Sequence, residues 1–178
     1  MAMKNSGRIA LTGVLTALAL VFLLLTAAPV TTVGLAALAG ICGIPVVVEL
    51  GRKAGFVHYG AVSLLALLIV PAIEGKAMYI AFFGYYTILK AWLEMKNLSR
   101  PAEWSIKIAV FLVALCAGGG AMWLMVRPAL PEWFSLWMLP VAVAMLTAVF
   151  AVYDWCLSGL AGLYAGRVQP QLRRLFRF

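Results

Sequence analysis

Residues 9–28, IALTGVLTALALVFLLLTAA, form a run of twenty residues that contains no charge. A helix needs about 20 mostly apolar residues to cross the hydrocarbon core of a bilayer. Lys4 and Arg8 precede the run, and Pro29 follows it. The run therefore predicts a membrane-crossing helix. The basic start and Ala27-Ala28 also allow a cleaved signal peptide, but the run is longer than the usual apolar core of about 7–15 residues.

The composition of the whole chain points to lipid as its solvent. Of the 178 residues, 65% are hydrophobic and 11% are charged. A soluble domain is nearer half apolar and about a quarter charged. A soluble fold of this length would therefore leave much apolar surface in water. The composition excludes an ordinary cytosolic enzyme, a disordered tail and a nucleic-acid module.

Five further apolar runs follow the first, and charged residues, Pro or Gly separate them. We expect spans at residues 9–28, 33–50, 55–73, 77–93, 104–126 and 133–166. The sixth is too long for one straight crossing, so its ends should lie along the interfaces or bend at Pro140. The predicted fold is an all-α integral membrane protein, with a six-transmembrane-helix bundle over residues 1–166.

The distribution of positive charge predicts the orientation. The chain carries 14 Lys and Arg against 6 Asp and Glu, a net charge of +8. With six spans and both termini cytoplasmic, 12 basic residues fall inside, and only Lys76 and Arg127 fall outside. This is the asymmetry that the positive-inside rule describes. The tail, residues 167–178, interleaves arginines with Leu and Phe. We expect it to lie on the anionic inner leaflet, although it could also bind a cytoplasmic partner.

A small polar set with aromatic neighbours lies at the predicted outer ends of spans three to six. Spacing places Tyr79 and Phe83 on one face of their helix, and likewise Trp133 and Trp137. These residues fit either an aromatic belt at the headgroups or an aromatic-lined pocket for a flat, polar small molecule. The candidate ligand-binding residues on this side are Glu74, Lys76, Tyr79, Phe83, Trp123, Arg127 and Trp137.

Asp154 is the ionisable residue placed deepest in a predicted span. An ionised group in hydrocarbon is costly, so it should face the bundle interior and find a donor such as Tyr, Trp, Ser158 or a lysine. A structural hydrogen bond and a role in ligand binding or coupling both remain open. Lys90 and Glu94 are one helical turn apart and should pair, and Lys107 can reach the same interface by extending its stem.

Two groups of small residues favour close helix approach. Ala10, Gly13 and Ala17 form a stripe on the first span. Such a stripe lets another helix come near, either inside the bundle or from a separate membrane subunit. Three consecutive glycines, residues 118–120, allow a kink, a close helix crossing or a point of ligand approach.

The sequence contains no catalytic signature. The GxSxG, HExxH and Walker patterns are all absent, so a hydrolase or a nucleotide-dependent enzyme is not predicted. The single histidine, His58, lacks the cluster of partners that a metal site needs. We therefore expect no enzymatic activity, no cofactor and no metal.

Several stretches resemble a known family. The first helix, ALTGVLTAL at residues 10–18, together with FFGYYTILK at 82–90, VELG at 48–51 and EWSIK at 103–107, resembles the substrate-binding S components of energy-coupling factor transporters. The likeness is to a group of uncharacterised S-component-like proteins of Gram-positive bacteria. It covers roughly residues 8–115 and is weaker through the sixth span.

The resemblance implies a subunit of the bacterial cytoplasmic membrane that captures a vitamin or precursor-like molecule from outside. Ala10, Gly13 and Ala17 would dock onto a transmembrane coupling subunit driven by cytoplasmic ATPases. The N-terminal His-containing site of nickel and cobalt members is absent, so metal uptake is not implied. One alternative is a non-transporting accessory or assembly protein that scaffolds a partner. Another is an enzyme acting on lipid, which would require Asp154 to converge with Lys90 or Lys107.

Overall fold

The fold was analysed in a computed structural model that describes residues 5–28, 31–96, 99–126 and 138–170. Every regular element in these ranges is helical, so the all-α prediction is confirmed for the described part of the chain. The α-helices are α1 (Asn5–Leu25), α2 (Thr32–Ile41), α3 (Gly43–Leu50), α4 (Arg52–Ile69), α5 (Ile73–Met78), α6 (Gly84–Met95), α7 (Arg100–Val126) and α8 (Met138–Leu163). Two π-helical turns, η2 (Tyr79–Phe83) and η3 (Tyr164–Val168), complete the set.

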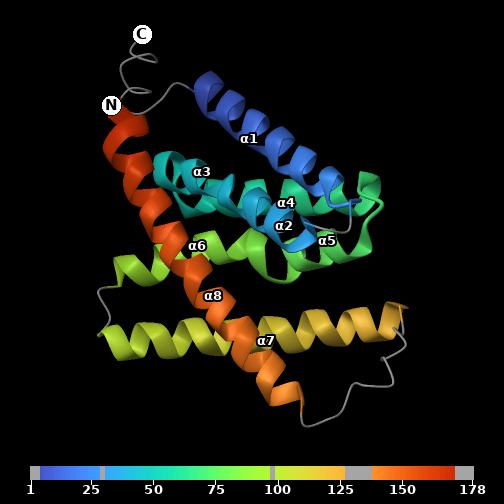
Figure 1. Ribbon diagram of the computed structural model, residues 1–178. Helices are drawn as coiled ribbons and strands as arrows, with labels where there is room; N and C mark the ends of the chain where they lie inside the picture. Colours follow the sequence, from blue (N-terminus) through green and yellow to red (C-terminus); the bar gives the residue numbers. More distant parts are fainter. Residues whose placement is uncertain (1–4, 29–30, 97–98, 127–137, 171–178) are drawn as a thin grey trace.

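The chain forms a layered bundle in which successive runs alternate in direction, with α2 and α3 forming one run and α5, η2 and α6 another (Figure 1). The α3–α4 and α6–α7 connections lie at one end of the bundle, together with the start of α1 and the end of α8. The α1–α2 and α4–α5 connections lie at the opposite end. Helix α8 crosses the layers steeply and packs against α6 and α7, because Asp154 and Phe150 contact residues of both helices.

Proline and glycine explain the breaks between helices. Pro45 has no N–H, so the carbonyl of Ile41 loses its helical donor, and the predicted second span divides into α2 and α3. Gly51 adopts φ +82 between α3 and α4, a left-handed conformation that favours glycine. Val70 is extended, as expected for a residue before a proline, and α4 ends there.

The predicted fourth span is a composite helix. Elements α5, η2 and α6 follow one another without interruption over residues 73–95, with a π-helical turn at the centre. Tyr59 on α4 supports this turn, because its hydroxyl donates to the carbonyl oxygen of Ile80 at 2.8 Å. Its ring packs against Gly84, where a Cβ atom would come within 2.5 Å of Tyr59 Cδ2.

Five stretches of helix in the described chain are long and apolar enough to cross a membrane. The composite helix over residues 73–95 is not among them. It is helical throughout but carries four charged residues towards its ends. The five stretches are Ser6–Leu25, Thr32–Leu50, Arg52–Ile69, Arg100–Gly120 and Pro140–Val168.

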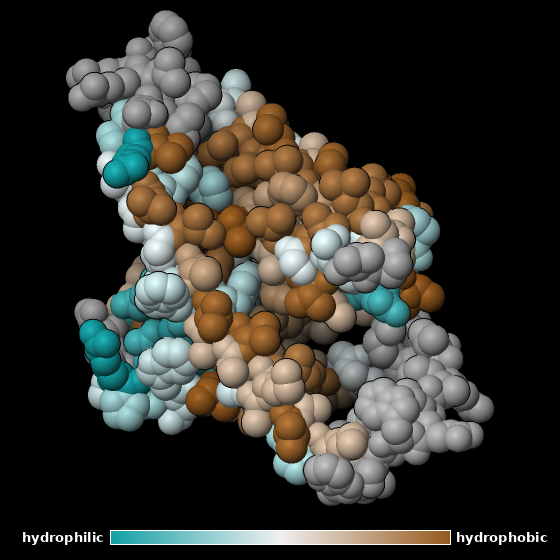
Figure 2. Space-filling model, in the orientation of Figure 1, coloured by the Kyte–Doolittle hydropathy of each residue, from teal (hydrophilic) through white to brown (hydrophobic). Residues whose placement is uncertain are grey.

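Two clusters of buried side chains form the core of the described residues, and many large hydrophobic side chains are exposed on the outside. One core cluster joins α1, α2 and α4 around Tyr79, and a second joins α6, α7 and α8 around Phe82. Figure 2 shows hydrophobic surface over α1 to α4, whereas hydrophilic residues gather near the α6–α7 connection and at the end of α8. Burial inside and exposure outside are what a lipid-embedded bundle requires.

Candidate ligand cavity and the ion cluster beneath it

A cavity of about 260 Å³ lies between the composite helix, α7 and α8. Its walls are almost entirely apolar. The residues that line it include Glu74, Phe83, Phe111, Gly118, Gly119 and Tyr153. Phe111 and Gly119 are eight residues apart on α7, so the cavity extends about 12 Å along that helix.

Stacked aromatic rings close one end of the cavity. The rings of Phe111 and Phe150 are parallel within 9°, with centroids 4.7 Å apart. Phe82 meets both of them edge-on at 5.4 and 5.6 Å, and Tyr153 contacts Phe83 at 5.1 Å. These rings form a floor that separates the cavity from the end of the bundle where the α6–α7 connection lies. We call the set Phe82, Phe111 and Phe150 the aromatic floor.

Glu74 lies at the opposite end of the cavity, in the first turn of α5, and is exposed. It is the one acidic residue among the described residues that line the cavity. Lys76, predicted as its neighbour in the site, does not line the cavity. Its Nζ atom donates to the carbonyl oxygen of Val70 at 3.0 Å, and so satisfies a carbonyl at the end of α4.

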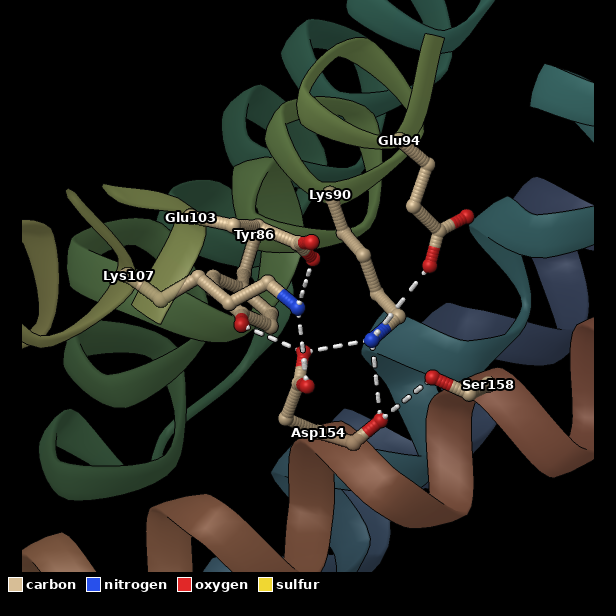
Figure 3. Close-up of polar contacts among 7 residues, drawn as sticks. All are labelled: Tyr86, Lys90, Glu94, Glu103, Lys107, Asp154 and Ser158. Carbon is tan, nitrogen blue, oxygen red and sulfur yellow. Dashed lines mark hydrogen bonds and ion pairs between the residues drawn. The ribbon is translucent and has the colours of Figure 1, made fainter. Parts of the chain in front are cut away.

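Figure 3 shows an ion cluster that lies one helical turn beyond the aromatic floor, since each ring of the floor is four residues from a member of the cluster. Asp154 projects from α8 and is only 4% exposed, and its carboxylate accepts hydrogen bonds from three side chains. Lys90 Nζ donates to Oδ1 at 2.5 Å, Lys107 Nζ donates to Oδ2 at 3.0 Å, and the Tyr86 hydroxyl donates to Oδ1 at 2.7 Å. The cluster therefore ties α6, α7 and α8 together through one buried carboxylate.

Two glutamates at the edge of the cluster supply further negative charge. Glu103 pairs with Lys107 at 2.7 Å, and Glu94 pairs with Lys90 at 3.6 Å. The Lys90 and Lys107 side chains are 5% and 4% exposed, so each ammonium group is held in a nearly dry site by carboxylates. A buried charge is tolerated only when it is paired and hydrogen-bonded. The arrangement meets this condition for all three buried ions.

The cluster confirms the expectations for the buried charges. Asp154 faces the bundle interior and finds tyrosine and lysine donors, Lys90 pairs with Glu94, and Lys107 reaches the same site. Asp154 also converges with Lys90 and Lys107, as an enzyme acting on lipid would require. None of the three ions lines the cavity, however, because the aromatic floor lies between. Whether Asp154 contributes to ligand binding stays a prediction.

The structure separates the other predicted ligand-binding residues. Phe83 lines the cavity. Tyr79 does not, because it is fully buried in the core cluster with α1, α2 and α4. The Trp123 side chain lies outside the described residues, as do Arg127, Trp133 and Trp137 entirely.

Sequence reasoning missed the aromatic floor. Phe82 and Tyr86 are four residues apart, and so are Phe150 and Asp154, spacings that place each pair on one helix face. The pairing of these faces depends on how the helices are rotated, which a helical spacing does not reveal.

The three glycines at 118–120 did point to the cavity from the sequence. Gly118 approaches Ala81, whose Cβ would lie 3.1 Å from an added Cβ, and Gly118 and Gly119 both line the cavity.

The small-residue stripe of α1 faces away from the bundle. Ala10, Gly13 and Ala17 are all exposed, and a Cβ added at Gly13 would meet nothing within 4 Å. The helix packs through its other face, where Thr16 Oγ1 and His58 Nδ1 are 3.0 Å apart. Packing of the stripe inside the described bundle is therefore excluded, and its surface is free for lipid or for another helix.

No protein-family model, curated protein or solved structure matched this chain.

Proposed function

We propose that this chain is the membrane-embedded substrate-capture subunit of a small-molecule uptake transporter of the energy-coupling factor type. The cavity above the aromatic floor is the observation that carries the proposal. Ligand sites are commonly concave and mostly apolar, with a few polar groups that fix orientation. The cavity has this character, with Glu74 at its rim and aromatic rings at its base.

The lining favours an apolar ligand over the flat, polar molecule expected from the sequence. Aromatic walls complement a planar or hydrocarbon body, because burial of apolar area supplies the affinity. The exposed carboxylate of Glu74 would select a ligand that carries a cationic or hydrogen-bond donating group at one end. The proposed ligand class is therefore a vitamin or precursor with an apolar body and one such polar group.

The distribution of charge supports an outward-facing cavity in the bacterial cytoplasmic membrane. Of the nine basic residues described, only Lys76 lies at the Glu74 end of the bundle. The other eight, at the opposite end or in the helical turns nearest to it, are Arg8, Arg52, Lys53, Lys90, Lys96, Arg100, Lys107 and Arg167. By the positive-inside rule this opposite end, with both termini, would be cytoplasmic. The ligand would then enter from outside, and the ion cluster would close the inner side.

Six crossings are part of this proposal. The composite helix over residues 73–95 has 23 residues, which gives a length of about 34 Å. This exceeds the hydrocarbon thickness of about 30 Å. Its charged residues lie near the two ends, and residues 77–89 are uncharged. The helix can therefore serve as the fourth crossing, with Lys90 turned into the ion cluster.

The exposed stripe on α1 supports docking onto a transmembrane coupling subunit. Ala10, Gly13 and Ala17 offer a smooth helix surface that another helix can approach closely. The same surface would serve the second candidate function, an accessory or assembly protein that scaffolds a partner without transporting. The two functions differ in whether the cavity holds a ligand.

The cavity offers a matched pair of variants to test capture. Gly119 lines it, and a Cβ added there meets nothing within 4 Å, so Gly119→Leu should fill the cavity without displacing neighbours. Gly120 is equally free of neighbours but does not line the cavity, so Gly120→Leu is the control. The protein is purified in nanodiscs, and its solvent extract is analysed by mass spectrometry.

A compound present with the wild type and Gly120→Leu but lost with Gly119→Leu would support capture. If all three extracts are identical and no coupling subunit copurifies, the transport proposal is wrong. Docking is tested separately with Gly13→Leu, and Gly34→Leu on α2 is the control, because both glycines are exposed with no neighbour within 4 Å. The accessory function would be favoured by two observations together. The cavity holds no compound, and a membrane subunit that copurifies with the wild type and Gly34→Leu is lost with Gly13→Leu.

A further inference from the structure

A second hollow, of about 240 Å³, lies between α4 and α6 at the end of the bundle opposite Glu74. It is distinct from the ligand cavity, since the two share no lining residue. The residues that line it are Arg52, Phe56, Tyr85, Ile88, Leu89 and Trp92. We call this hollow the α4–α6 groove.

The groove has a charged end and an apolar end. Arg52 is the first residue of α4, and Trp92 lies in the last turns of α6. Phe56 lies one turn further along α4, and Tyr85 lies seven residues before Trp92, about 10 Å deeper along α6. The wall between the two ends is aromatic and aliphatic, and Phe56 is 58% exposed.

Positive charge gathers at the open end of the groove. Lys96 places its Nζ atom 4.1 Å from the centroid of the Trp92 ring. Arg52 and the adjacent Lys53 are both exposed. No acidic side chain forms an ion pair with Arg52, Lys53 or Lys96 in the described ranges, whereas Lys90 and Lys107 are fully paired. Arg52 therefore lines the groove and Lys96 lies over Trp92 at its end, and neither cation is ion-paired with an acidic side chain among the described residues.

We propose that the α4–α6 groove binds one anionic phospholipid, with its phosphate at Arg52 and Lys96 and part of an acyl chain along Phe56 and Leu89. Basic pockets between transmembrane helices at the cytoplasmic side are suited to acidic headgroups, because the cations attract the phosphate and the helices accept the chain. Trp92 lies where the apolar wall meets the charges, a position typical of tryptophan at a membrane interface. A soluble anion would satisfy the cations but leave the aromatic wall uncovered.

The helices that form the groove are held in place by close packing. A Cβ added at Gly55 would lie 2.7 Å from Val47 Cγ2 and 3.2 Å from Ile88 Cγ1, so α4 is pressed against α3 and α6 beside the groove. Arg52 and Phe56 are presented on the same face of α4, four residues apart. The groove is thus a preformed site, and lipid binding would need no rearrangement of the two helices.

The test measures lipid binding to the delipidated full-length protein in detergent by native mass spectrometry. The probes are phosphatidylglycerol, phosphatidylcholine as the zwitterionic control, and glycerol 1-phosphate as a headgroup without chains. The variant is Arg52→Gln with Lys96→Gln. The matched control is Arg8→Gln with Arg100→Gln, which removes the same charge from the same end of the bundle without touching the groove.

We expect one phosphatidylglycerol to bind the wild type in clear preference to phosphatidylcholine. Each cation near an anionic headgroup contributes about fivefold in affinity, so the groove variant should bind roughly 25-fold more weakly. The control variant and the conservative pair Arg52→Lys with Lys96→Arg should retain binding, which separates loss of charge from loss of fold. Phe56→Ala should weaken phosphatidylglycerol but leave glycerol 1-phosphate unaffected.

Three results would overturn the proposal. The first is equal binding of phosphatidylglycerol and phosphatidylcholine. The second is equal loss in the groove and control variants, which would indicate a diffuse charge effect. The third is a copurifying polypeptide, lost only in the groove variant, together with unchanged lipid binding, which would assign the groove to a protein. None of these results bears on the ligand cavity, so this inference can fail without the transport proposal.

Discussion

Replacing Asp154 with Asn tests how much stability the ion cluster carries. The two side chains have nearly the same shape, so the substitution leaves no cavity and changes only charge and hydrogen bonding. The carboxylate accepts from Lys90, Lys107 and Tyr86. An amide at this position removes the only buried negative charge of the cluster and turns one acceptor into a donor that faces a lysine.

The expected loss of stability depends on which acceptors each lysine keeps after the substitution. Removing one partner of a buried ion pair costs about 3–5 kcal/mol, because the other charge stays buried without compensation. Lys107 keeps Glu103 at 2.7 Å, with a glutamate side chain that is 24% exposed. Lys90 keeps the backbone carbonyl oxygen of residue 154 at 3.0 Å, but its one remaining carboxylate is Glu94 at 3.6 Å, with a side chain that is 48% exposed. Lys90 should therefore account for most of the loss.

The assay is thermal unfolding of the detergent-solubilised protein, followed by size-exclusion chromatography with fluorescence detection. For a protein of this length we expect Tm to fall by roughly 6–20 °C in Asp154→Asn. Adding Lys90→Met should restore more of the loss than adding Lys107→Met. Ser158→Ala, one turn along the same helix and exposed, is the control and should change Tm little.

Two results would refute this reasoning. If Asp154→Asn matches the wild type within 2 °C, on the order of 1 kcal/mol or less, the buried charges do not stabilise the bundle. If Lys107→Met restores more of the lost Tm than Lys90→Met does, then Glu103 does not compensate Lys107 better than Glu94 compensates Lys90, and the ion-pair distances are a poor guide to stability.

The remaining predictions concern helix packing and helix ends, and thermal unfolding in detergent checks each of them. Gly84→Ala should destabilise by about 1–3 kcal/mol, because the added Cβ would come within 2.5 Å of Tyr59; an unchanged Tm would mean that the ring moves freely. Tyr59→Phe should cost about 1 kcal/mol through the lost hydrogen bond to Ile80. A Tm that stays the same or rises would contradict that bond. Gly51→Ala should cost about 1–3 kcal/mol, because φ +82 with ψ 175 is a backbone conformation that is essentially confined to glycine. Gly120→Ala, in a helix with open space, should be neutral or stabilising.

The positions of the helices could largely be predicted from the sequence, because a lipid-facing helix needs a long apolar run whatever it packs against. The predicted runs correspond to the observed helices or pairs of helices over most of the described chain. The break near Cys42 was missed, although Pro45 was visible, because an apolar run continues through it. The π-helical turn left no trace in composition, since one extra residue does not change an apolar pattern.

The candidate site was harder to predict, because it depends on contacts between distant segments. Asp154 was identified from the cost of a charge in hydrocarbon, a property of the residue alone. Its partner Lys90 is 64 residues away, and only the folded chain brings the two together. The aromatic floor depends in the same way on the rotation of α7 and α8, so Phe111 and Phe150 carried no local signal.

The π-helical turn fixes how the two halves of the composite helix are rotated against each other. Its extra residue sets the phase between α5, which carries Glu74, and α6, which carries Tyr86 and Lys90. If the same residues formed regular α-helix throughout, one half of the composite helix would rotate against the other by about 100°, the turn of one residue. Tyr86 and Lys90 would then turn away from Asp154 while every side chain of the cluster stayed in the sequence. A relative of this chain whose helix is regular α-helix here should therefore have one residue fewer between the positions of Glu74 and Lys90.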